Sequence, residues 1–409
     1  MAIVDVKVHP AIGIARLGDS PDDFFIGPEK VWEVVEPEDG FKDAQCRVKR
    51  QAARFRLYAY HDNNTVEELT VANADIQWTV HLANKKATHA GNGGSAAQLT
   101  IDPGARTLNG AVQREVFDTG TVLLDGTTTT VPLGEARTDT DGRLLVLGGF
   151  GQSASPMNKG LNFPRSEGWH DDVSDGPVTA HVKVHASGDE FDAVPAWVIA
   201  APPKFAPGLM TPVTLFDRVF QMAHEQAWVS GPATPSYTND VYPILQRARD
   251  IHAVRGDAVG HHTWADPVYN ATDRSTIFAR LNPPGDMPDL SESPLTATQY
   301  AIMQAWKDGT FTQDWAAPPQ PAADITPDGL DRAALMNCVG AAFYPGIEAG
   351  GIVDGAGVQP IIDPANYVGG TDPLRLNAGA LSPGDITQWM ALPWQNDFYL
   401  CQDTWWPVP

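Results

Sequence analysis

Residues 178–184 read Val-Thr-Ala-His-Val-Lys-Val, so apolar and polar side chains alternate over the whole stretch. Because successive side chains of a β-strand point to opposite faces, this alternation predicts a strand with one buried face. Runs rich in β-branched and apolar residues, separated by Gly, Asp and Asn turns, precede it: Ile76–His81, Thr121–Leu124, Thr127–Thr130 and Leu144–Leu147. We therefore expect residues 1 to about 200 to form a sandwich or barrel-like sheet, with residues 127–130 as an edge or hairpin strand.

The spacing of apolar residues changes to a helical period after residue 203. Between residues 213 and 229, Leu215, Val219, Met222 and Ala223 fall on one face of a helix. Further helices are expected over residues 241–253, 297–307 and 330–338, and residues 339–409 are rich in Gly, Pro and Trp with little periodicity. The expected fold class is α+β and β-rich, with a sheet-dominated N-terminal half and a helical and irregular C-terminal half around one core.

A proline-rich stretch over residues 316–327 has the composition of a domain linker. We interpret it as a surface loop, because the segments on either side are too short and irregular to close separate cores. We therefore expect a single domain over residues 1–409, in which residues 1–200 are mainly β and residues 201–409 carry the functional site.

The side-chain charges exclude several classes of partner. Fifty acidic and 28 basic side chains give a net charge of −22, which repels nucleic-acid phosphates and anionic lipid. The densest cationic run, residues 47–56, is interpreted as an internal ion-pairing segment. The first residues lack the pattern of a secretory signal, and no run of about 18 apolar residues occurs. We expect a cytoplasmic protein, or one exported without a conventional signal peptide, and neither a nucleic-acid nor a membrane partner.

Signatures of common catalytic and metal sites are absent from the sequence: no GxSxG, Walker A or HExxH motif occurs. His261 and His262 are adjacent, and adjacent side chains point in different directions, which favours a structural role over metal ligation. Asp171, Asp172 and Asp175 lack the spacing of an EF-hand and are interpreted as a hydrogen-bonded turn. We expect no metal.

The cysteines form neither a disulfide framework nor a CxxC pair. The chain has three cysteines, Cys46, Cys338 and Cys401. At most one disulfide can therefore form within the chain, and at least one cysteine is not part of it.

Two segments of the C-terminal half carry the most informative motifs. They read Asn337-Cys-Val-Gly-Ala-Ala-Phe-Tyr-Pro-Gly-Ile-Glu348 and Pro393-Trp-Gln-Asn-Asp-Phe-Tyr-Leu-Cys-Gln-Asp-Thr-Trp-Trp-Pro407. Together they resemble the LodA-like family of lysine ε-oxidase and glycine oxidase quinoproteins. The resemblance extends over nearly the whole chain, through the segments at residues 9–21, 24–29, 41–45, 47–56, 78–87, 171–178 and 237–243.

This resemblance implies a cofactor made from the protein itself, a cysteine tryptophylquinone. By that resemblance, Cys338 is the cross-linking cysteine and Trp405 its partner, with Trp406 as the alternative. A quinone carbonyl is an electrophile that ordinary side chains do not supply, and it accepts a primary amine. The implied reaction is oxidative deamination of an amino acid or primary amine by dioxygen, with release of ammonia and hydrogen peroxide.

The resemblance also implies supporting residues and partners. Tyr344 and Trp406 would wall the pocket, and one of Asp331, Glu348 and Asp397 would act as base or orienting carboxylate. A flavin-dependent maturation protein would form the quinone, and the chain is compatible with a homo-oligomer.

The sequence departs from the family pattern at one position that bears on the cofactor. The family has an aspartate four residues before the cysteine, where this chain has Ala334, and the nearest carboxylate on the expected helix is Asp331. Two alternatives therefore stay open. One is a family scaffold with an unformed or altered cofactor that acts in another oxidative biosynthetic step. The other is a non-catalytic binding relative, in which Cys338 is a small buried apolar residue and the tryptophans pack the chain.

Overall fold

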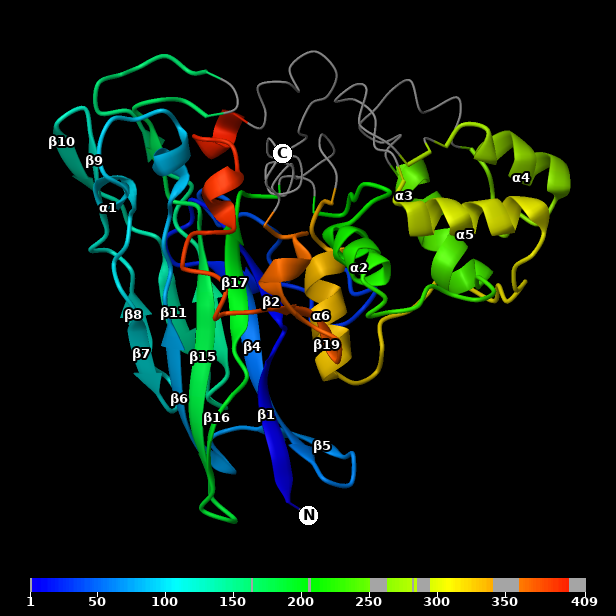
Figure 1. The fold of residues 1–409 in the computed structure, drawn as a ribbon, viewed down its shortest axis with the longest axis horizontal. Helices are drawn as coiled ribbons and strands as arrows, with labels where there is room; N and C mark the ends of the chain where they lie inside the picture. The colour runs from blue at the N-terminus through cyan, green and yellow to red at the C-terminus, as the bar shows by residue number, and fades with distance from the viewer. Residues whose placement is uncertain are drawn as a thin grey trace.

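The computed structural model describes residues 2–162, 165–204, 207–250, 263–281, 283–284, 295–340 and 360–396. Strands dominate the chain up to residue 201, and most of the helices follow it (Figure 1). The expected β-rich α+β fold, with a sheet-dominated first half and a more helical second half, is confirmed.

Thirteen strands of the described residues form one large sheet. Its path runs β7 (Arg106–Asn109), β6 (Ala74–Val80), β15 (Ser174–Val184), β17 (Ala196–Ala201), β2 (Ile12–Arg16), β4 (Arg50–His61), β12 (Leu144–Leu147), β11 (Glu135–Thr138) and β8 (Arg114–Val116). β1 (Ile3–His9), β3 (Phe24–Ile26) and β5 (Val66–Leu69) pair with β4, and β16 (Glu190–Asp192) pairs with β15. β7 and β8, the two ends of the path, lie close to each other, so the sheet curls toward closure.

The alternating stretch that predicts a strand lies in β15. Val178, Ala180 and Val182 are buried in the core, while His181 and Lys183 on the opposite face are exposed. The predicted hairpin is also present, because β9 (Thr121–Leu124) pairs with β10 (Thr127–Thr130) in an antiparallel register. Two further two-stranded sheets are β13 (Ser153–Ala154) with β14 (His170–Asp171) and β18 (Tyr367–Gly369) with β19 (Asp372–Leu376).

β2 and β17 are adjacent in the sheet and are buried on both faces. They pair in parallel, with Trp197 opposite Ile12. The side chains on the face covered by helices are Ile12, Ile14, Trp197 and Ile199, and those on the inner face are Ala15, Val198 and Ala200. Gly13 is required on the inner face, because a Cβ there would lie 2.3 Å from the Phe55 ring.

The described helices are α1 (Ala96–Leu99), α2 (Leu215–Glu225), α3 (Tyr242–Asp250), α4 (Ala271–Phe278), α5 (Ala297–Asp308) and α6 (Pro327–Met336), with short turns η1 (Lys86–His89), η2 (Tyr237–Val241), η6 (Pro364–Asn366) and η7 (Thr387–Trp389). Helices α2 and α6 pack against one face of the sheet and α3, α4 and α5 lie at one end of the molecule, whereas the short α1 lies beside β9 at the opposite side (Figure 1). The four predicted helices are present as α2, α3, α5 and α6, with shifts of a few residues at their described ends. Residues 251–253 of the predicted helix over 241–253 lie outside the described residues, and α4 was not predicted. Residues 316–326 form an irregular, largely exposed segment. None of the helices in the described ranges is long and apolar enough to cross a membrane.

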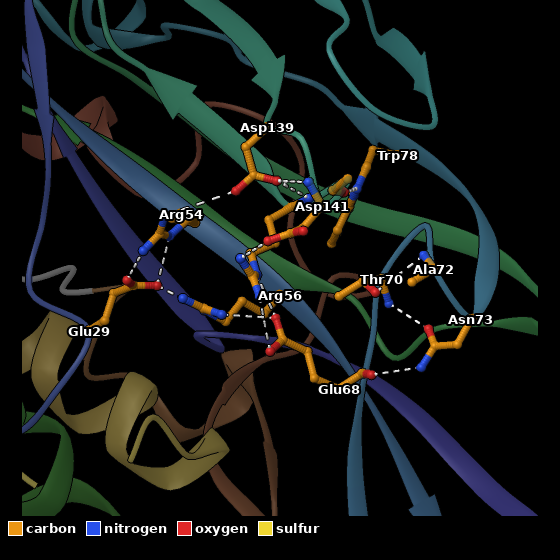
Figure 2. Close-up of polar contacts among 12 residues, drawn as sticks. Glu29, Arg54, Arg56, Glu68, Thr70, Ala72, Asn73, Trp78, Asp139 and Asp141 are labelled. Atoms are coloured by element: carbon orange, nitrogen blue, oxygen red, sulfur yellow. Dashed lines mark hydrogen bonds and ion pairs between the residues drawn. The ribbon is translucent and has the colours of Figure 1, made fainter. Parts of the chain in front are cut away.

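The cationic run on β4 is an ion-pairing segment, as predicted. Figure 2 shows Glu29 between Arg54 and Arg56, and Glu29 Oε1 accepts hydrogen bonds of 2.9 Å from the Nε atoms of both arginines. Arg56 also donates to Glu68 over 2.9 Å, and Arg50 pairs with Glu135 in the interior. These charges are balanced within the sheet, so they do not form a basic surface.

Candidate functional site

The position of Cys338 is set by the end of α6. Thr326 caps the start of the helix through its side chain, and Pro327 occupies the first turn, where a missing N–H costs nothing. The helix ends at Met336, and the Cys338 amide donates to the Leu335 carbonyl over 3.2 Å. The Cys338 carbonyl in turn accepts a hydrogen bond of 2.9 Å from the Leu215 amide. The first turn of α2 thus fixes the backbone on which Cys338 lies.

Cys338 is buried in an apolar cluster between the sheet and the helices, with 1% of its surface exposed. We call this group of side chains the outer cluster: Ile12, Ile14, Leu17, Val173, Trp197, Ile199, Ala201, Leu215, Val219, Met222, Ala334, Leu335, Cys338, Ile361, Tyr367, Leu376, Ile386, Met390 and Trp394. The same cluster contains the indole rings of Trp197 and Trp394, so the cysteine and two indoles share one apolar, water-excluding part of the core.

Trp394 is held by contacts with two segments near the end of the sheet. Its backbone amide donates to Asp171 Oδ2 over 2.8 Å, and its indole Nε1 donates to the Gly151 carbonyl over 3.3 Å. Asp171 is fully buried and also accepts from Lys86 Nζ and, over 2.9 Å, from Asn84 Nδ2. A buried, charge-compensated carboxylate therefore positions the backbone of Trp394.

Asp175 holds the segment around η7 against the sheet. It is fully buried and accepts hydrogen bonds from Trp197 Nε1 over 2.8 Å, from the Thr387 amide over 2.7 Å and from the Thr387 hydroxyl over 2.6 Å. Burial raises the pKa of Asp175 to about 6 although these donors lower it. Its hydrogen bonds tie β15 to residues 386–387, shortly before Trp394 in the chain.

The expectation that Asp171, Asp172 and Asp175 form a turn is wrong, because Asp171 lies in β14 and Asp175 in β15. Fully buried carboxylates are rare, so a sequence rich in aspartate predicts an exposed turn more readily than a buried strand. Among the described residues, no three His, Cys, Asp or Glu side chains come together in a group that could hold a metal ion. These carboxylates instead accept hydrogen bonds from protein donors.

Asp172 differs from its two neighbours because its hydrogen bonding is incomplete. Its Oδ2 accepts from the Gln152 amide over 3.0 Å, but within the described part of the chain Oδ1 has no hydrogen-bond partner. Burial raises the pKa of Asp172 to about 7, against the opposing effect of its backbone hydrogen bonds. Burial also lowers the pKa of His170, two residues earlier.

Asp331, the predicted base or orienting carboxylate, takes part in a buried network at the β1–β2 corner. Its Oδ1 accepts from the Ala11 amide over 2.6 Å and lies 2.9 Å from His9 Nδ1. The other ring nitrogen of His9 lies 2.9 Å from the Tyr60 hydroxyl and 3.4 Å from an Arg375 nitrogen. Asp331 therefore anchors α6 to the sheet, about two helical turns before Cys338.

The position at which the family pattern has an aspartate lies in the outer cluster. Ala334 is buried there with Cys338, so no carboxylate lies one turn before the cysteine. The remaining predicted site residues fall outside the described residues: Tyr344, Glu348, Asp397, Trp405 and Trp406. His261 and His262 also fall outside them.

A cavity of about 260 Å³ lies beside the end of α6. Met336 and Asn337 form part of its wall, together with Arg16, Lys49 and Lys204. Arg16 Nη2 donates to the Asn337 carbonyl over 2.9 Å, which places a guanidinium next to the residue that precedes Cys338.

The sequence assigned no role to Trp394 or Arg16, and it placed Asp171 in a turn rather than beside Trp394. All three lie in segments that carry the family resemblance, and this was the available signal. The hydrogen bonds of Trp394 with Asp171 and of Arg16 with Asn337 join residues far apart in the chain, which local patterns do not reveal.

Comparison with known proteins places the chain in a family. Residues 9–93 and 90–200 match the family description "L-Lysine epsilon oxidase N-terminal", and residues 284–409 match "L-lysine epsilon oxidase C-terminal domain". The chain belongs to the L-lysine epsilon-oxidase family. As a member of this oxidase family, it is an oxidoreductase.

The chain is similar to a protein named L-lysine 6-oxidase and to solved structures of L-Lys epsilon-oxidase. L-lysine 6-oxidase of Marinomonas mediterranea is 26% identical over 526 residues, which cover 97% of this chain and 71% of the relative. A crystal structure of L-Lys epsilon-oxidase from the same organism is 24% identical with a TM-score of 0.75, over 97% of this chain and 75% of the other. A second structure, described as its Schiff base intermediate with L-Lys, has a TM-score of 0.74 at the same identity and coverage. The likeness to the solved structures supports the fold described above.

Proposed function

We propose that this protein oxidises the amine-bearing carbon of an amino acid or primary amine, using a cysteine tryptophylquinone formed on Cys338. The observation that carries the proposal is the burial of Cys338 with indole side chains in the outer cluster of a chain that belongs to an oxidase family. In the net reaction, two electrons and two protons pass from the C–N unit to dioxygen, which gives hydrogen peroxide. Water supplies the carbonyl oxygen of the product, and ammonia leaves.

The residues around Cys338 fit such a cofactor. A thiol and an indole are the two groups that a cysteine tryptophylquinone requires, and the outer cluster contains both. When formed, the cofactor would supply an electrophilic carbonyl for the substrate amine. The apolar side chains of the cluster exclude water, which strengthens electrostatic interactions at the site and raises the pKa of a carboxylic base.

For the tryptophan partner, the proposal is Trp405 or Trp406, and the fold adds Trp394 as a third candidate. Trp394 is packed in the same cluster as Cys338 and is fixed through Asp171 and Gly151. Trp197 is less suitable because it lies within β17, outside the C-terminal motif that carries the family resemblance.

For the remaining roles, we propose Glu348 or Asp397 as the base that removes the substrate proton. Tyr344 and Trp406 are proposed as walls of the pocket. Asp331 is proposed as a positioning residue, because its carboxylate already binds the Ala11 amide and His9.

Formation of the cofactor needs an oxidant. The thioether joins the sulfur to a ring carbon with loss of two hydrogen atoms, and the quinone gains two oxygen atoms while two further ring hydrogens are lost. We propose that dioxygen and a flavin-dependent maturation protein accept these electrons.

A single domain over residues 1–409 and a homo-oligomer stay predictions.

The test is peptide mapping of protein co-expressed with its genomic neighbours, together with a visible spectrum. Trypsin leaves all four C-terminal tryptophans in one peptide, residues 376–409, so it cannot identify the partner. Cleavage before aspartate places Cys338 in residues 331–353, Trp394 in residues 385–396, and Trp405 with Trp406 in residues 403–409. A peptide of residues 331–353 joined to either C-terminal peptide, with quinone absorbance, supports the proposal and identifies the segment involved. Unmodified Cys338 in protein made with its maturation partner would overturn it.

A second candidate function is favoured by Ala334. This buried apolar residue occupies the position of the assisting carboxylate in the family pattern. A scaffold without that carboxylate would have an unformed or altered cofactor and act in another oxidative biosynthetic step, or bind a ligand without catalysis. The same mapping decides, because in this case the two C-terminal peptides stay separate from residues 331–353.

A further inference from the structure

Residues of helices α2, α3, α5 and α6 surround a second cavity, of about 360 Å³, which we call the helical cavity. Its volume falls within the range of pockets that hold small organic molecules. Cys338 is absent from its described wall, so this cavity is separate from the proposed cofactor position. The described wall is largely apolar, with three aromatic rings and several aliphatic side chains that include Trp32, Phe216, Phe220, Ile244, Ile302 and Leu374.

The charges in this wall balance one another. Arg247 lies 3.2 Å from Asp217, and Arg332 lies 3.8 Å from Asp328, whose side chain is 80% exposed. Burial raises the pKa of Asp240, and the nearby charge of Arg332 opposes this rise. A charged ligand would therefore lose its hydration in an apolar cavity without gaining a free counter-charge. The wall favours an uncharged ligand.

Two hydrogen-bonding atoms of the wall lack a partner in the part of the chain that the structure describes. They are Nε of Arg332 on α6 and the hydroxyl oxygen of Thr298 on α5. The other guanidinium nitrogens of Arg332 also make no hydrogen bond to described residues, because the 3.8 Å contact with Asp328 is too long for one. The guanidinium instead lies over the Phe216 ring, 5.4 Å from its centroid. An acceptor on a ligand would relieve the cost of these unused donors.

The backbone of Trp32 is strained where its side chain joins this wall. Its φ of 68° lies in the left-handed region, which favours glycine and is rare for a bulky residue. Such strain persists only where the surroundings fix the residue, and it is concentrated at functional segments such as ligand-binding loops. Trp32 lines both the helical cavity and the cavity beside the end of α6. Its conformation thus places a large aromatic side chain in the walls of two cavities.

We infer that the helical cavity binds an uncharged aromatic molecule that carries a hydrogen-bond acceptor such as a carbonyl oxygen, with Arg332 as the donor. The aromatic ring of the ligand would pack against Trp32 and the apolar side chains of the wall. This site goes beyond the proposed oxidase function, because it requires neither an amine nor the cofactor. A ligand bound there would contact α6, the helix that leads to Cys338, at Arg332 and Met336.

The test compares acetophenone with three related phenyl compounds: ethylbenzene, which has no acceptor, benzoate, which is an anion, and phenyltrimethylammonium, which is a cation. None of the four is a primary amine, so none can be a substrate for oxidative deamination. Their binding to the full-length chain is measured by saturation-transfer NMR titration. We expect acetophenone to bind with a Kd of about 1 mM or below, and at least about tenfold more tightly than each of the other three.

Variants of the wall assign the contacts. Arg332→Met keeps an apolar side chain but removes the donors, so it should remove about tenfold of the affinity for acetophenone and leave that for ethylbenzene unchanged. Trp32→Ala should weaken both compounds, because it removes the aromatic surface. Arg280→Met is the matched control, because it removes an exposed arginine that is absent from the described wall. It should change neither affinity.

The outcomes separate this inference from the proposed function. Equal affinity for acetophenone and ethylbenzene, or an unchanged preference in Arg332→Met, overturns the site. Tighter binding of benzoate or phenyltrimethylammonium overturns the uncharged class of ligand. The titrations are repeated on Cys338→Ser, which cannot form the cofactor, and the affinities should stay the same even if the oxidase proposal fails. If Arg332→Met does not fold, Arg332→Gln and Thr298→Val test the same donors, and a preference that neither variant reduces would count against the site.

Discussion

Substitution of Asp331 by alanine should destabilise the protein far more than the same substitution at Asp328 on the same helix. In Asp331→Ala the Ala11 amide and His9 Nδ1, which the carboxylate contacts at 2.6 and 2.9 Å, lose their partner inside the protein. A buried polar group left without a hydrogen bond costs about 1–3 kcal/mol, so the two together predict a loss of about 2–6 kcal/mol. Asp328 has a side chain that is 80% exposed and lies 3.8 Å from Arg332, so Asp328→Ala should cost only a few tenths of a kcal/mol.

The assay is urea-induced unfolding followed by tryptophan fluorescence, with both variants compared with the wild type at pH 7. Asp331→Asn is the informative third variant, because it keeps the shape and one carbonyl oxygen that can accept from the Ala11 amide. It should recover a large part of the loss. If the unfolding free energies of Asp331→Ala and Asp328→Ala agree within about 0.5 kcal/mol, the anchoring role assigned to Asp331 is refuted.

The same variants distinguish positioning from chemistry. If Asp331→Asn folds and still forms the Cys338 thioether when it is made with the maturation partner, Asp331 acts by holding α6 in place. A stable Asp331→Asn protein with an unmodified cysteine would instead assign the carboxylate a direct part in cofactor formation.

Three further predictions concern buried charges. The folded protein keeps a proton on Asp172 up to about pH 7, whereas the unfolded chain releases it near 3.8. The unfolding free energy of the wild type relative to Asp172→Asn should therefore fall by up to about 1.4 kcal/mol per pH unit between these values. Unfolding curves at pH 4.5 and 7 would show this fall, and a constant difference would contradict it. Lys86→Met should lower the unfolding free energy by about 3–5 kcal/mol, because it leaves the fully buried Asp171 without its cation. A loss below about 1 kcal/mol in urea unfolding would argue against a stabilising Lys86–Asp171 ion pair. The pKa of Glu29 is lowered because the hydrogen bonds and charges of its two arginines in Figure 2 outweigh its burial. The wild type should therefore exceed Glu29→Gln in stability at pH 7, and this advantage should shrink as the pH falls below about 4. Denaturation at pH 7 and 3 tests this, and an advantage as large at pH 3 as at pH 7 would refute it.

The strands that the sequence predicted well are those whose evidence is local. In residues 178–184 one face is buried and the other exposed, so alternation alone indicates the strand. The hairpin at residues 121–130 is predictable because Gly126 marks its turn. In contrast, β2 and β17 are buried on both faces, and their environment depends on helices far away in the chain. The hydrogen bond from the Ala11 amide, just before β2, to Asp331 of α6 joins residues 320 positions apart.

The candidate site was predicted unevenly for the same reason. Cys338 was identified from its motif, and the structure places it in a buried cluster with indole rings. Asp331 was identified as a carboxylate on the correct helix, but its contact with His9 depends on the path of the chain and no spacing rule reveals it. The packing of Trp394 against the outer cluster and the cavity lined by Arg16 also depend on tertiary contacts.

The place of β2 between β17 and β4 has a consequence for the order of events during protein synthesis. Strand β2 cannot complete its pairing until residues 196–201 have left the ribosome. The cluster around Cys338 further requires residues 215–222, 334–338 and 361–394. Such long-range pairing is slow, and exposed strand edges attract wrong partners in the meantime. The environment of Cys338 is therefore assembled only after residue 394 has been synthesised, so an enzyme that recognises this environment and modifies the cysteine has to act after translation of that segment.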